Sequence, residues 1–439
     1  MERQAFKQLL NWKASSYRKP LIVRGARQVG KTWLMKEFAK TQYVDCIYVN
    51  FEKNEIMKSI FEASLEPRHI LSKLITFSGI EPKPGKTLIL FDEIQEAPRG
   101  LTSLKYFCED APEYHVIAAG SLLGMTLHSH VSFPVGKVSF LDLYPMNFIE
   151  FLNAIEQKSY ADLLQKQDWS SITVFKQQYT DWLRYYYVVG GMPEAVALFA
   201  RTGNVESVRQ IQNNILDQYD SDFSKHAPNE VVPRIRMLWN SILPQLAKEN
   251  RKFMYAKIKQ GARAREYELA MEWLLDCGLI NQVFRVTKPD LPLKFYQDSS
   301  AFKLFMVDIG LMTAFGQLDA ITILEGSRIF EEFKGALTEQ FVFQQLVQNK
   351  DLVINYWSSE RSDCEIDFLL QFSNEVIPLE VKASENLNAK SLRMFYQKFH
   401  PKNTIRTSLS DYRKEEWMCN VPLYAIPSHF QKHISNIQG

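Results

Sequence analysis

Short hydrophobic runs alternate with helical patterns along the first third of the chain. The runs cover residues 21–24, 46–51, 87–91, 115–120 and 138–143. A helical pattern over residues 31–40 follows the first run. Strands that are hydrophobic throughout, rather than at every second position, are typical of a parallel sheet covered on both faces. The pattern therefore predicts an α/β unit with a parallel sheet over residues 1–145.

The next stretch, residues 146–230, has the period of helices. Residues 148–164 and 175–187 are rich in aromatic side chains, and residues 204–219 form an amphipathic pattern. The sequence Gly190-Gly191-Met192-Pro193 predicts a sharp break between helices. We expect a helical lid here.

Two further units follow. In residues 231–325 a helical pattern over 267–275 precedes Gly278 and a strand-like run over 279–286, which predicts a winged helix. Residues 326–439 return to alternating helix and strand, which predicts a second α/β module.

Composition excludes several classes of protein. The 439 residues carry a net charge of +2, so no global basic field favours nucleic acid or a membrane surface. The five cysteines are far apart and form no CxxC pair, which is typical of a reducing compartment and argues against a disulfide framework or a zinc site. Neither a signal peptide nor an apolar run of about 18 residues is present. We expect a cytoplasmic protein that does not enter a membrane.

A glycine-rich loop follows the first predicted strand. Its sequence is Gly25-Ala26-Arg27-Gln28-Val29-Gly30-Lys31-Thr32, which matches the P-loop pattern GxxxxGK[ST]. In such a loop backbone N–H groups surround the phosphates, the lysine contacts the β- and γ-phosphates, and the hydroxyl binds Mg²⁺. The loop therefore predicts a site for ATP with Mg²⁺.

Acidic and polar residues follow two of the other predicted strands. Asp92 and Glu93 come directly after residues 87–91, at an edge of the sheet where ligands bind. We expect Asp92 to hold Mg²⁺ and Glu93 to orient or deprotonate the attacking water. Ser121 follows residues 115–120 and could sense the γ-phosphate, or it could simply cap a helix.

These motifs together resemble the AAA-type ATPase family of bacteria and archaea that carries a C-terminal domain of unknown function. The motifs occur in order along nearly the whole chain: Arg24 to Thr32, Asp92-Glu93-Ile94-Gln95, Gly120-Ser121, Leu143-Tyr144-Pro145 with Phe148 to Phe151, Gly190-Gly191-Met192-Pro193-Glu194, Lys303-Leu304-Phe305 and Asp308-Ile309-Gly310. The family has Gly-Arg where this chain has Gly136-Lys137. Since lysine lacks the planar fork of arginine, no arginine finger is assigned, and Arg99 and Arg184 are only candidates.

The C-terminal module holds a second set of charged residues. Asp367, Glu380 and Lys382 resemble the D…ExK signature of restriction-endonuclease-like nucleases, and Glu339 would match the helix carboxylate of that family. The resemblance implies that Asp367 and Glu380 bind a metal and that Lys382 assists the attacking water. Period two places Glu380 and Lys382 on one face of a strand, so a salt bridge without catalytic function is the alternative.

Residues 231–290 carry eleven lysines and arginines against six acidic residues. Six of these basic residues precede the helical pattern at 267–275: Arg251, Lys252, Lys257, Lys259, Arg263 and Arg265. A winged helix would present them to DNA, whereas the alternative is a solvated face that mediates only protein contacts. Four histidines, His115, His128, His130 and His226, lack the spacing of metal ligands.

The sequence therefore predicts an α/β P-loop ATPase core with a helical lid, a winged helix and a nuclease-like α/β module. The leading hypothesis is an ATP-hydrolysing regulator or switch that acts on DNA. One alternative is a metal-dependent DNA nuclease gated by ATP, and another is a nucleotide-binding scaffold without nuclease activity. A protein partner or a second copy of the chain could complete the site.

Overall fold

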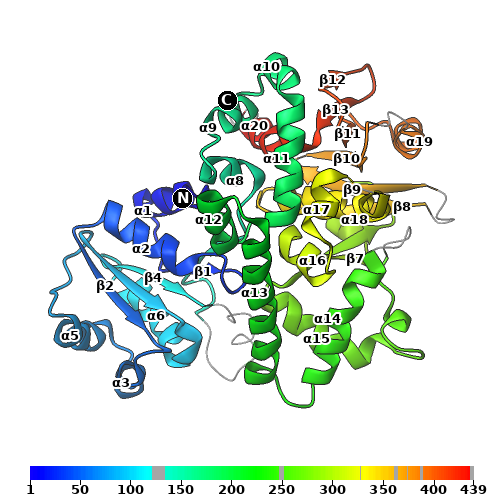
Figure 1. Ribbon diagram of the computed structural model, residues 1–439. Helices are drawn as coiled ribbons and strands as arrows, with labels where there is room; N and C mark the ends of the chain where they lie inside the picture. The colour runs from blue at the N-terminus through cyan, green and yellow to red at the C-terminus, as the bar shows by residue number, and fades with distance from the viewer. Residues whose placement is uncertain are drawn as a thin grey trace. The chain divides into compact units, whose positions relative to one another are not determined.

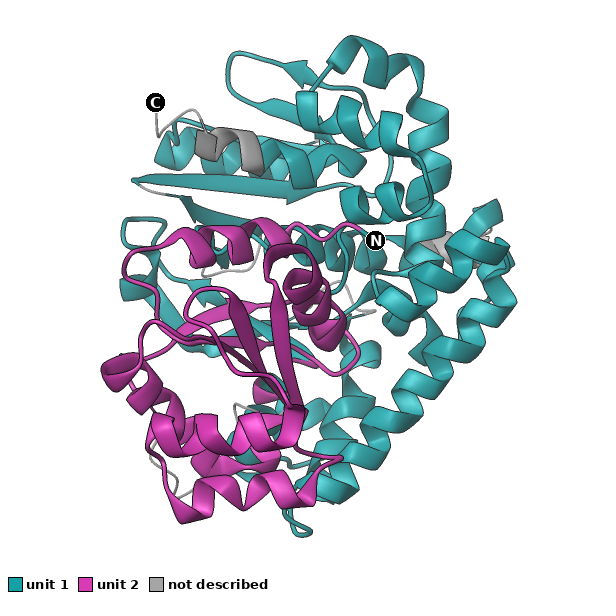
Figure 2. Ribbon diagram, turned by 90° about the vertical axis from the view of Figure 1, so that its left-hand side faces the viewer, with its two compact units in different colours: residues 1, 145–275, 280–439 teal, residues 2–144, 276–279 magenta. Residues whose placement is uncertain are grey.

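The computed structural model describes residues 1–120, 134–246, 252–326, 328–359, 364–372, 374–385 and 389–435, without the side chains of 328–332 and 431–435. The chain forms two compact units, which Figure 2 distinguishes by colour. The N-terminal unit comprises Glu2–Tyr144 with Asp276–Leu279. The C-terminal unit comprises Pro145–Leu275 and Ile280–Gly439, together with Met1.

A five-stranded sheet in the order β2-β3-β4-β1-β5 forms the centre of the N-terminal unit, and all of its strand pairs are parallel. The strands are β1 (Leu21–Arg24), β2 (Asp45–Asn50), β3 (Thr87–Asp92), β4 (His115–Ala119) and β5 (Ser139–Asp142). The helices are α1 (Ala5–Ala14), α2 (Lys31–Gln42), α3 (Glu55–Lys58), α4 (Ile60–Ala63), α5 (Pro67–Ser78) and α6 (Pro98–Asp110), with a 3₁₀ turn at Ile94–Glu96. The predicted α/β fold class with a parallel sheet is confirmed.

The central strands are buried on both faces, as their hydrophobic runs predict. Every residue of β3 is buried, and Phe91 packs edge-on against Phe61 and Phe107 in the main core. Burying an aromatic side chain of this kind stabilises the fold by about 1.5–3 kcal/mol. The core thus fixes the strand whose carboxyl end carries Asp92.

The first part of the C-terminal unit is helical (Figure 1). Its helices are α8 (Phe148–Ala154), α9 (Lys158–Lys166), α10 (Trp169–Val174), α11 (Lys176–Val189), α12 (Pro193–Thr202), α13 (Val205–His226), α14 (Val232–Leu246) and α15 (Ala264–Asp276). The helical pattern at 148–164 corresponds to two helices rather than one. Glu156, between them, has φ +63°, a left-handed conformation that ends a helix.

An eight-stranded sheet in the order β12-β13-β11-β10-β9-β8-β6-β7 forms the rest of this unit. Its strands are β6 (Ile280–Val286), β7 (Gln297–Met306), β8 (Val353–Ser358), β9 (Glu365–Phe372), β10 (Glu375–Val381), β11 (Ile405–Ser408), β12 (Arg413–Lys414) and β13 (Cys419–Pro422). The accompanying helices are α16 (Ile309–Phe315), α17 (Ala320–Glu325), α18 (Arg328–Leu346), α19 (Lys390–Phe399) and α20 (Ile426–Ser435). Since β6 pairs with β8, one sheet runs through residue 325, where the sequence suggests a boundary. The boundaries of the four units stay predictions.

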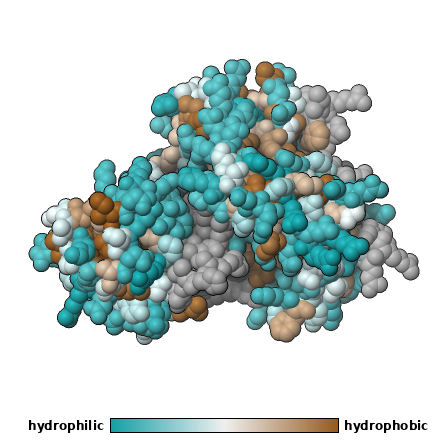
Figure 3. Space-filling view, turned by 90° about the horizontal axis from the view of Figure 1, so that it is seen from below, coloured by the Kyte–Doolittle hydropathy of each residue, from teal (hydrophilic) through white to brown (hydrophobic). Residues whose placement is uncertain are grey.

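Within the described residues, no helix has both the length and the apolar character that crossing a membrane requires. Figure 3 shows one face of the molecule, on which hydrophilic residues predominate and hydrophobic residues are scattered.

Candidate functional site

The glycine-rich loop lies between β1 and α2, as predicted. Gly25 has φ +145°, and a Cβ there would lie 2.1 Å from the carbonyl oxygen of Leu143. Gly30 has φ +94° and caps the start of α2. Only glycine meets both demands, because other residues rarely adopt these angles and no side chain fits beside Leu143. The two glycines therefore hold the loop in its folded-back form.

Lys31 begins α2 and is buried inside the loop. Its ammonium group donates to the carbonyl oxygens of Gly25 and Ala26, each at 2.8 Å. Burial lowers the pKa of Lys31 to about 8, although the carboxylates of Glu93 and Asp92 act in the opposite direction. These carboxylates favour the charged form that contacts phosphate.

Thr32 and Asp92 meet at the carboxyl end of β3. The Thr32 hydroxyl donates to Asp92 Oδ2 at 2.8 Å, and the Tyr48 hydroxyl of β2 donates to the same oxygen at 2.8 Å. A hydroxyl and a carboxylate are hard oxygen donors of the type that Mg²⁺ prefers. The residue types and their closeness therefore suit a magnesium site.

Glu93 directly follows this strand in a left-handed conformation, with φ +52°. Its Oε2 accepts a hydrogen bond from Gln95 Nε2 at 2.6 Å. Non-glycine residues in this conformation are uncommon and often occur at functional sites. Ser121, the expected γ-phosphate sensor, lies outside the described residues.

Two residues near the loop were not expected from the sequence. Arg3 is buried and donates to the carbonyl oxygens of Val29 at 2.9 Å and Tyr144 at 2.6 Å, so it connects the loop to the segment after β5. No local pattern marks Arg3. Tyr48 could have been proposed, because it lies near the carboxyl end of a strand beside β3.

The candidate cations for an arginine finger have other partners. Lys137 forms an ion pair with Glu109 at 2.8 Å, and Arg99 forms one with Glu62 at 3.0 Å. Arg184 donates to the carbonyl oxygen of Leu324 at 3.3 Å. The structure does not assign the finger to any of them.

Two of the resemblance motifs pack against each other in the C-terminal unit. Asp308 accepts hydrogen bonds from the backbone N–H of Gly191 at 2.6 Å and of Leu311 at 3.0 Å. A Cβ on Gly190 would lie 2.1 Å from Asp308 Oδ1, and a Cβ on Gly310 would lie 2.6 Å from the nitrogen of Gly190. Close backbone packing therefore explains why these motifs contain glycines next to an aspartate.

The predicted carboxylates of the C-terminal module lie on α18, β9 and β10. Asp367 forms a hydrogen bond with Glu339, and its Oδ2 accepts the backbone N–H of Val381 at 2.7 Å. Burial, and then the charge and hydrogen bond of Glu339, raise the pKa of Asp367 well above its ordinary value. Glu380 pairs with Lys382 at 2.8 Å, as the same-face prediction requires.

A further cation, Lys303 of β7, reaches these carboxylates. Its Nζ lies 2.6 Å from Glu365 Oε1 and 3.8 Å from Glu339 Oε1, and the residue is 1% exposed. Burial alone would lower the pKa of Lys303, but the charges of Glu339, Glu365 and Asp367 outweigh it and raise the pKa above its ordinary value. Lys303 begins one of the motifs that carry the family resemblance, but the sequence does not indicate its partners, because they are distant along the chain.

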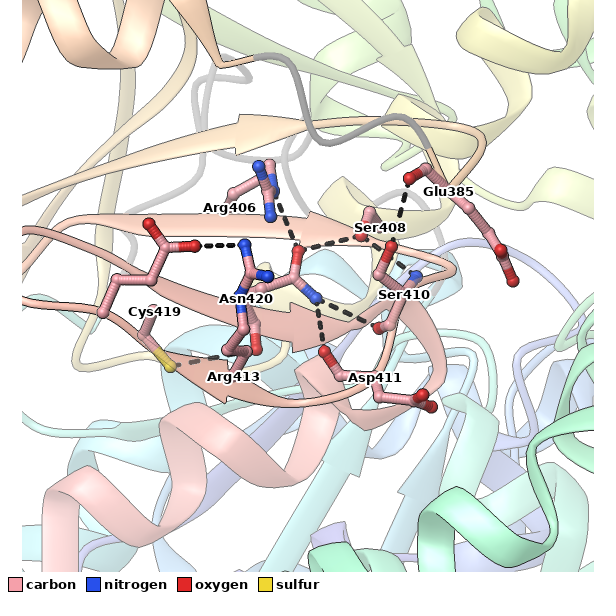
Figure 4. A network of polar contacts seen from close by, with 9 residues as sticks. Glu385, Arg406, Ser408, Ser410, Asp411, Arg413, Cys419 and Asn420 are labelled. Atoms are coloured by element: carbon pink, nitrogen blue, oxygen red, sulfur yellow. Dashed lines mark hydrogen bonds and ion pairs between the residues drawn. The ribbon is translucent and has the colours of Figure 1, made fainter.

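Another buried cation, Arg406 of β11, lies beside the cluster. Arg406 is the register partner of Glu380. Burial lowers the pKa of Arg406, and the charges of Glu415 and then Glu380 oppose this change. Its Nε donates to Asn420 Oδ1 at 2.9 Å, and Ser408 donates to the same oxygen at 2.8 Å (Figure 4). The Asn420 amide in turn donates to the carbonyl oxygens of Ser410 and Asp411. This network fixes the Arg406 side chain.

The basic residues ahead of the predicted recognition helix are mostly exposed. Lys257 ends a 3₁₀ turn at Tyr255–Lys257, and Lys259, Arg263 and Arg265 are also exposed near the start of α15. Lys252 is half-buried, and Arg251 lies outside the described residues, as do His128 and His130. The exposed residues are available to a ligand or a partner.

Comparison with protein families agrees with this geometry. Residues 17–152 match an AAA domain, residues 180–322 match a domain of unknown function (DUF8612), and residues 334–426 match another (DUF4143). The chain therefore joins an AAA P-loop ATPase domain to a C-terminal domain of unknown function, which confirms that part of the resemblance. The nuclease-like nature of the C-terminal module stays a prediction.

No curated protein matches the chain. Among solved structures, the Walker-type ATPase PABY2304 of Pyrococcus abyssi matches with a TM-score of 0.45 and 14% identity, over 72% of this chain and 95% of that chain. The ORC1 protein of Aeropyrum pernix, solved in complex with DNA, matches with a TM-score of 0.28 and 13% identity, over 73% and 93%. Cdc6p of Pyrobaculum aerophilum matches with a TM-score of 0.26 and 12% identity, over 74% and 93%.

Proposed function

We propose that this protein is an ATP-hydrolysing molecular switch. The observation that carries the proposal is the meeting of Thr32 and Asp92 at 2.8 Å, beside a loop that holds Lys31. Lys31 would bind the β- and γ-phosphates of ATP, and Thr32 and Asp92 would hold Mg²⁺, which neutralises the charge that develops on the phosphates.

Glu93 would direct the attacking water in this proposal. The hydrogen bond from Gln95 fixes the orientation of the Glu93 carboxylate. Breaking this hydrogen bond would let the carboxylate turn towards the water. The nucleotide state would then set the arrangement of the C-terminal unit, as in other nucleotide-driven switches.

The test compares ATP turnover of the full chain with that of two variants. Lys31→Ala should lose turnover by at least about 100-fold, because it removes a preorganised cation from the transferring phosphate. Glu93→Gln should bind ATP with Mg²⁺ yet lose turnover. Lys40→Ala, an exposed position at the far end of the same helix, is the control and should behave as wild type. Unchanged turnover in Lys31→Ala would sink the proposal.

We further propose that the switch acts on DNA through the exposed cations before α15. Double-stranded DNA should bind with a steep salt dependence, and Lys257→Ala with Arg263→Ala should reduce the log–log slope by about 0.9 per lost phosphate contact. Lys402→Ala, exposed elsewhere in the C-terminal unit, should leave the slope unchanged. Equal slopes for all three proteins would favour the alternative, a surface that contacts only proteins.

The rival functions make different predictions. A nuclease gated by ATP would cut plasmid DNA with Mg²⁺ or Mn²⁺, and Asp367→Ala would abolish the cutting. A scaffold would bind ATP without turning it over. The Glu380–Lys382 pair is compatible with a nuclease, but the lysine contacts of the neighbouring carboxylates weigh against it.

A further inference from the structure

Four carboxyl groups from three elements gather in the C-terminal module. Glu339 comes from α18, Glu365 and Asp367 come from β9, and Glu380 comes from β10. Glu339 and Glu380 are buried, at 3% and 4% exposure, so solvent contributes little to their stabilisation. Two buried carboxyl groups beside two half-buried ones need positive charge nearby.

The packing of β7 fixes where Lys303 points. Lys303 and Phe305 are two residues apart and therefore lie on the same face of the strand. The Phe305 ring stacks on Phe343 of α18 at 4.4 Å and contacts Phe368 of β9 at 5.6 Å. Phe343 is one helical turn beyond Glu339, on the same face of α18. The aromatic contacts thus hold the Lys303 ammonium group against the carboxylates.

The carboxylates are not arranged as the ligands of a divalent metal. Mg²⁺ requires a near-octahedral set of oxygens at about 2.0–2.1 Å. Here Asp367 Oδ2 accepts a backbone N–H and Glu380 Oε1 pairs with Lys382. Among the described residues no group of three or more histidine, cysteine or acidic side chains is arranged to hold a metal ion.

Lysine and arginine supply the positive charge instead. Lys303 contacts Glu365 and Glu339, Lys382 contacts Glu380, and Arg406 lies beside Glu380 on the neighbouring strand. All three cations are side chains of the protein and not bound ions. Their positions follow from strand register and from packing.

We propose that the ammonium group of Lys303, in place of a divalent metal, neutralises this carboxylate cluster. The cluster then holds β7 against α18 and β9 and does not cut nucleic acid. The contact joins two segments of the sequence, 231–325 and 326–439, within one unit. The ion pairs of the cluster thus hold the hairpin β6–β7 against the C-terminal module.

Mn²⁺ binding to the full chain without nucleotide tests this proposal independently of the ATPase. Free Mn²⁺ is measured by its electron paramagnetic resonance, and thermal midpoints are recorded with and without Mn²⁺. Lys303→Met removes the cation while keeping a side chain of similar length. Lys382→Met is the matched control, because it removes a cation from the same cluster but leaves Lys303 in place.

The wild type and Lys382→Met should bind no Mn²⁺ that depends on Asp367, and Mn²⁺ should not raise their thermal midpoints. Lys303→Met should unfold at a lower temperature and gain one bound Mn²⁺, which raises its midpoint. The second substitution Asp367→Asn should remove that gained site. An equal midpoint for Lys303→Met and the wild type would overturn the proposal.

The wild type alone keeps the proposal falsifiable if Lys303→Met does not fold. Mn²⁺ bound by the wild type, retained in Asp92→Asn and lost in Asp367→Asn, would show a metal site in the cluster and overturn the proposal. Equal Mn²⁺ binding by the wild type and Asp367→Asn supports it.

Discussion

The phenol of Tyr48 holds the carboxylate of Asp92 from the neighbouring strand. Burial raises the pKa of Tyr48 to about 12, so the hydroxyl keeps the proton that it donates to Asp92 Oδ2. Because Thr32 donates to the same oxygen, Tyr48 acts on the proposed magnesium site through Asp92. It is a positioning residue.

We expect Tyr48→Phe to raise the Mg²⁺ concentration for half-maximal ATP turnover by about tenfold, because a hydrogen bond to a charged group contributes about 1.5 kcal/mol. Turnover at saturating Mg²⁺ should stay near that of the wild type. Steady-state rates over a magnesium titration measure both quantities, with Tyr106→Phe on α6 as the control. An unchanged magnesium dependence would show that Tyr48 has only a packing role.

His115 gives the N-terminal unit a defined response to acid. Burial, and then the charges of Arg18 and Lys13, lower the pKa of His115 to about 4. Its Nδ1 lies 2.7 Å from the Tyr43 hydroxyl. An unfolded chain binds this proton below about pH 6.5, whereas the folded chain does not until about pH 4. His115 therefore contributes stability above pH 6.5, and the contribution is lost as the pH falls towards 4.

The thermal midpoint of the wild type should consequently decrease between pH 7 and pH 5 by more than that of His115→Asn. Asparagine can keep a polar contact with Tyr43 but does not titrate. Differential scanning calorimetry at matched ionic strength measures the difference. Parallel pH profiles for the two proteins would contradict the assignment.

The sequence identifies those functional residues that lie together in one contiguous motif. Gly25 to Thr32 and Asp92-Glu93 are contiguous motifs, and the structure places Thr32 beside Asp92. Arg3 and Lys303 act across long separations, so periodicity and motif spacing contain no information about their partners.

At the scale of elements, the turn between α11 and α12 depends on a glycine pair. Gly190 has φ +70°, and a Cβ there would lie 2.1 Å from Asp308 Oδ1. Gly203, after α12, has φ +65°, but no atom lies within 4 Å of its Cβ position. Gly190 and Gly203 share a positive φ, but their ψ angles are −160° and +4°, and the space around them also differs.

Gly203→Ala should cost about 1–2 kcal/mol, the penalty of a left-handed backbone for an L-residue. Gly190→Ala should cost several kcal/mol more, because its ψ of −160° lies in a region that is essentially restricted to glycine. In addition, Asp308 must move and give up its contact with the N–H of Gly191. Chemical unfolding of both variants measures the difference. Similar losses would mean that the turn relaxes around the new methyl group.

Elements follow from the sequence most directly where burial is uniform. The five parallel strands of the N-terminal unit lie within about one residue of the expected runs, and the three central strands β1, β3 and β4 are buried almost throughout. The helical period over 148–164 covers two helices, and it does not show the break between them, since the left-handed Glu156 leaves no mark in the hydrophobic pattern. The pairing of β6 with β8 is also absent from the pattern, because strand order depends on packing distant in sequence.

At the scale of the whole molecule, glutamines of α18 connect the segments of the C-terminal unit. Gln340 bonds to the backbone N–H and carbonyl of Met306, and Gln344 accepts the N–H of Ile309 and donates to Asp308. Gln345 accepts the N–H of Phe148. Buried backbone groups of two earlier segments thus have α18 as their partner, and they would be left unsatisfied without it.

A chain that ends at residue 326 should therefore fail to form a stable C-terminal unit, because it loses β8, the α18 glutamines and the partners of Lys303 together. We expect it to be insoluble alone, and to become soluble and copurify when residues 328–439 are coexpressed as a separate chain. Size-exclusion chromatography and calorimetry of the copurified pair, against the intact chain, measure the outcome. If the shortened chain alone were monomeric and unfolded cooperatively near the midpoint of the intact protein, the C-terminal module would be an independent domain, as the sequence boundary at 325 suggests. Insolubility that coexpression corrects would instead show that segments 231–325 and 326–439 fold as one body.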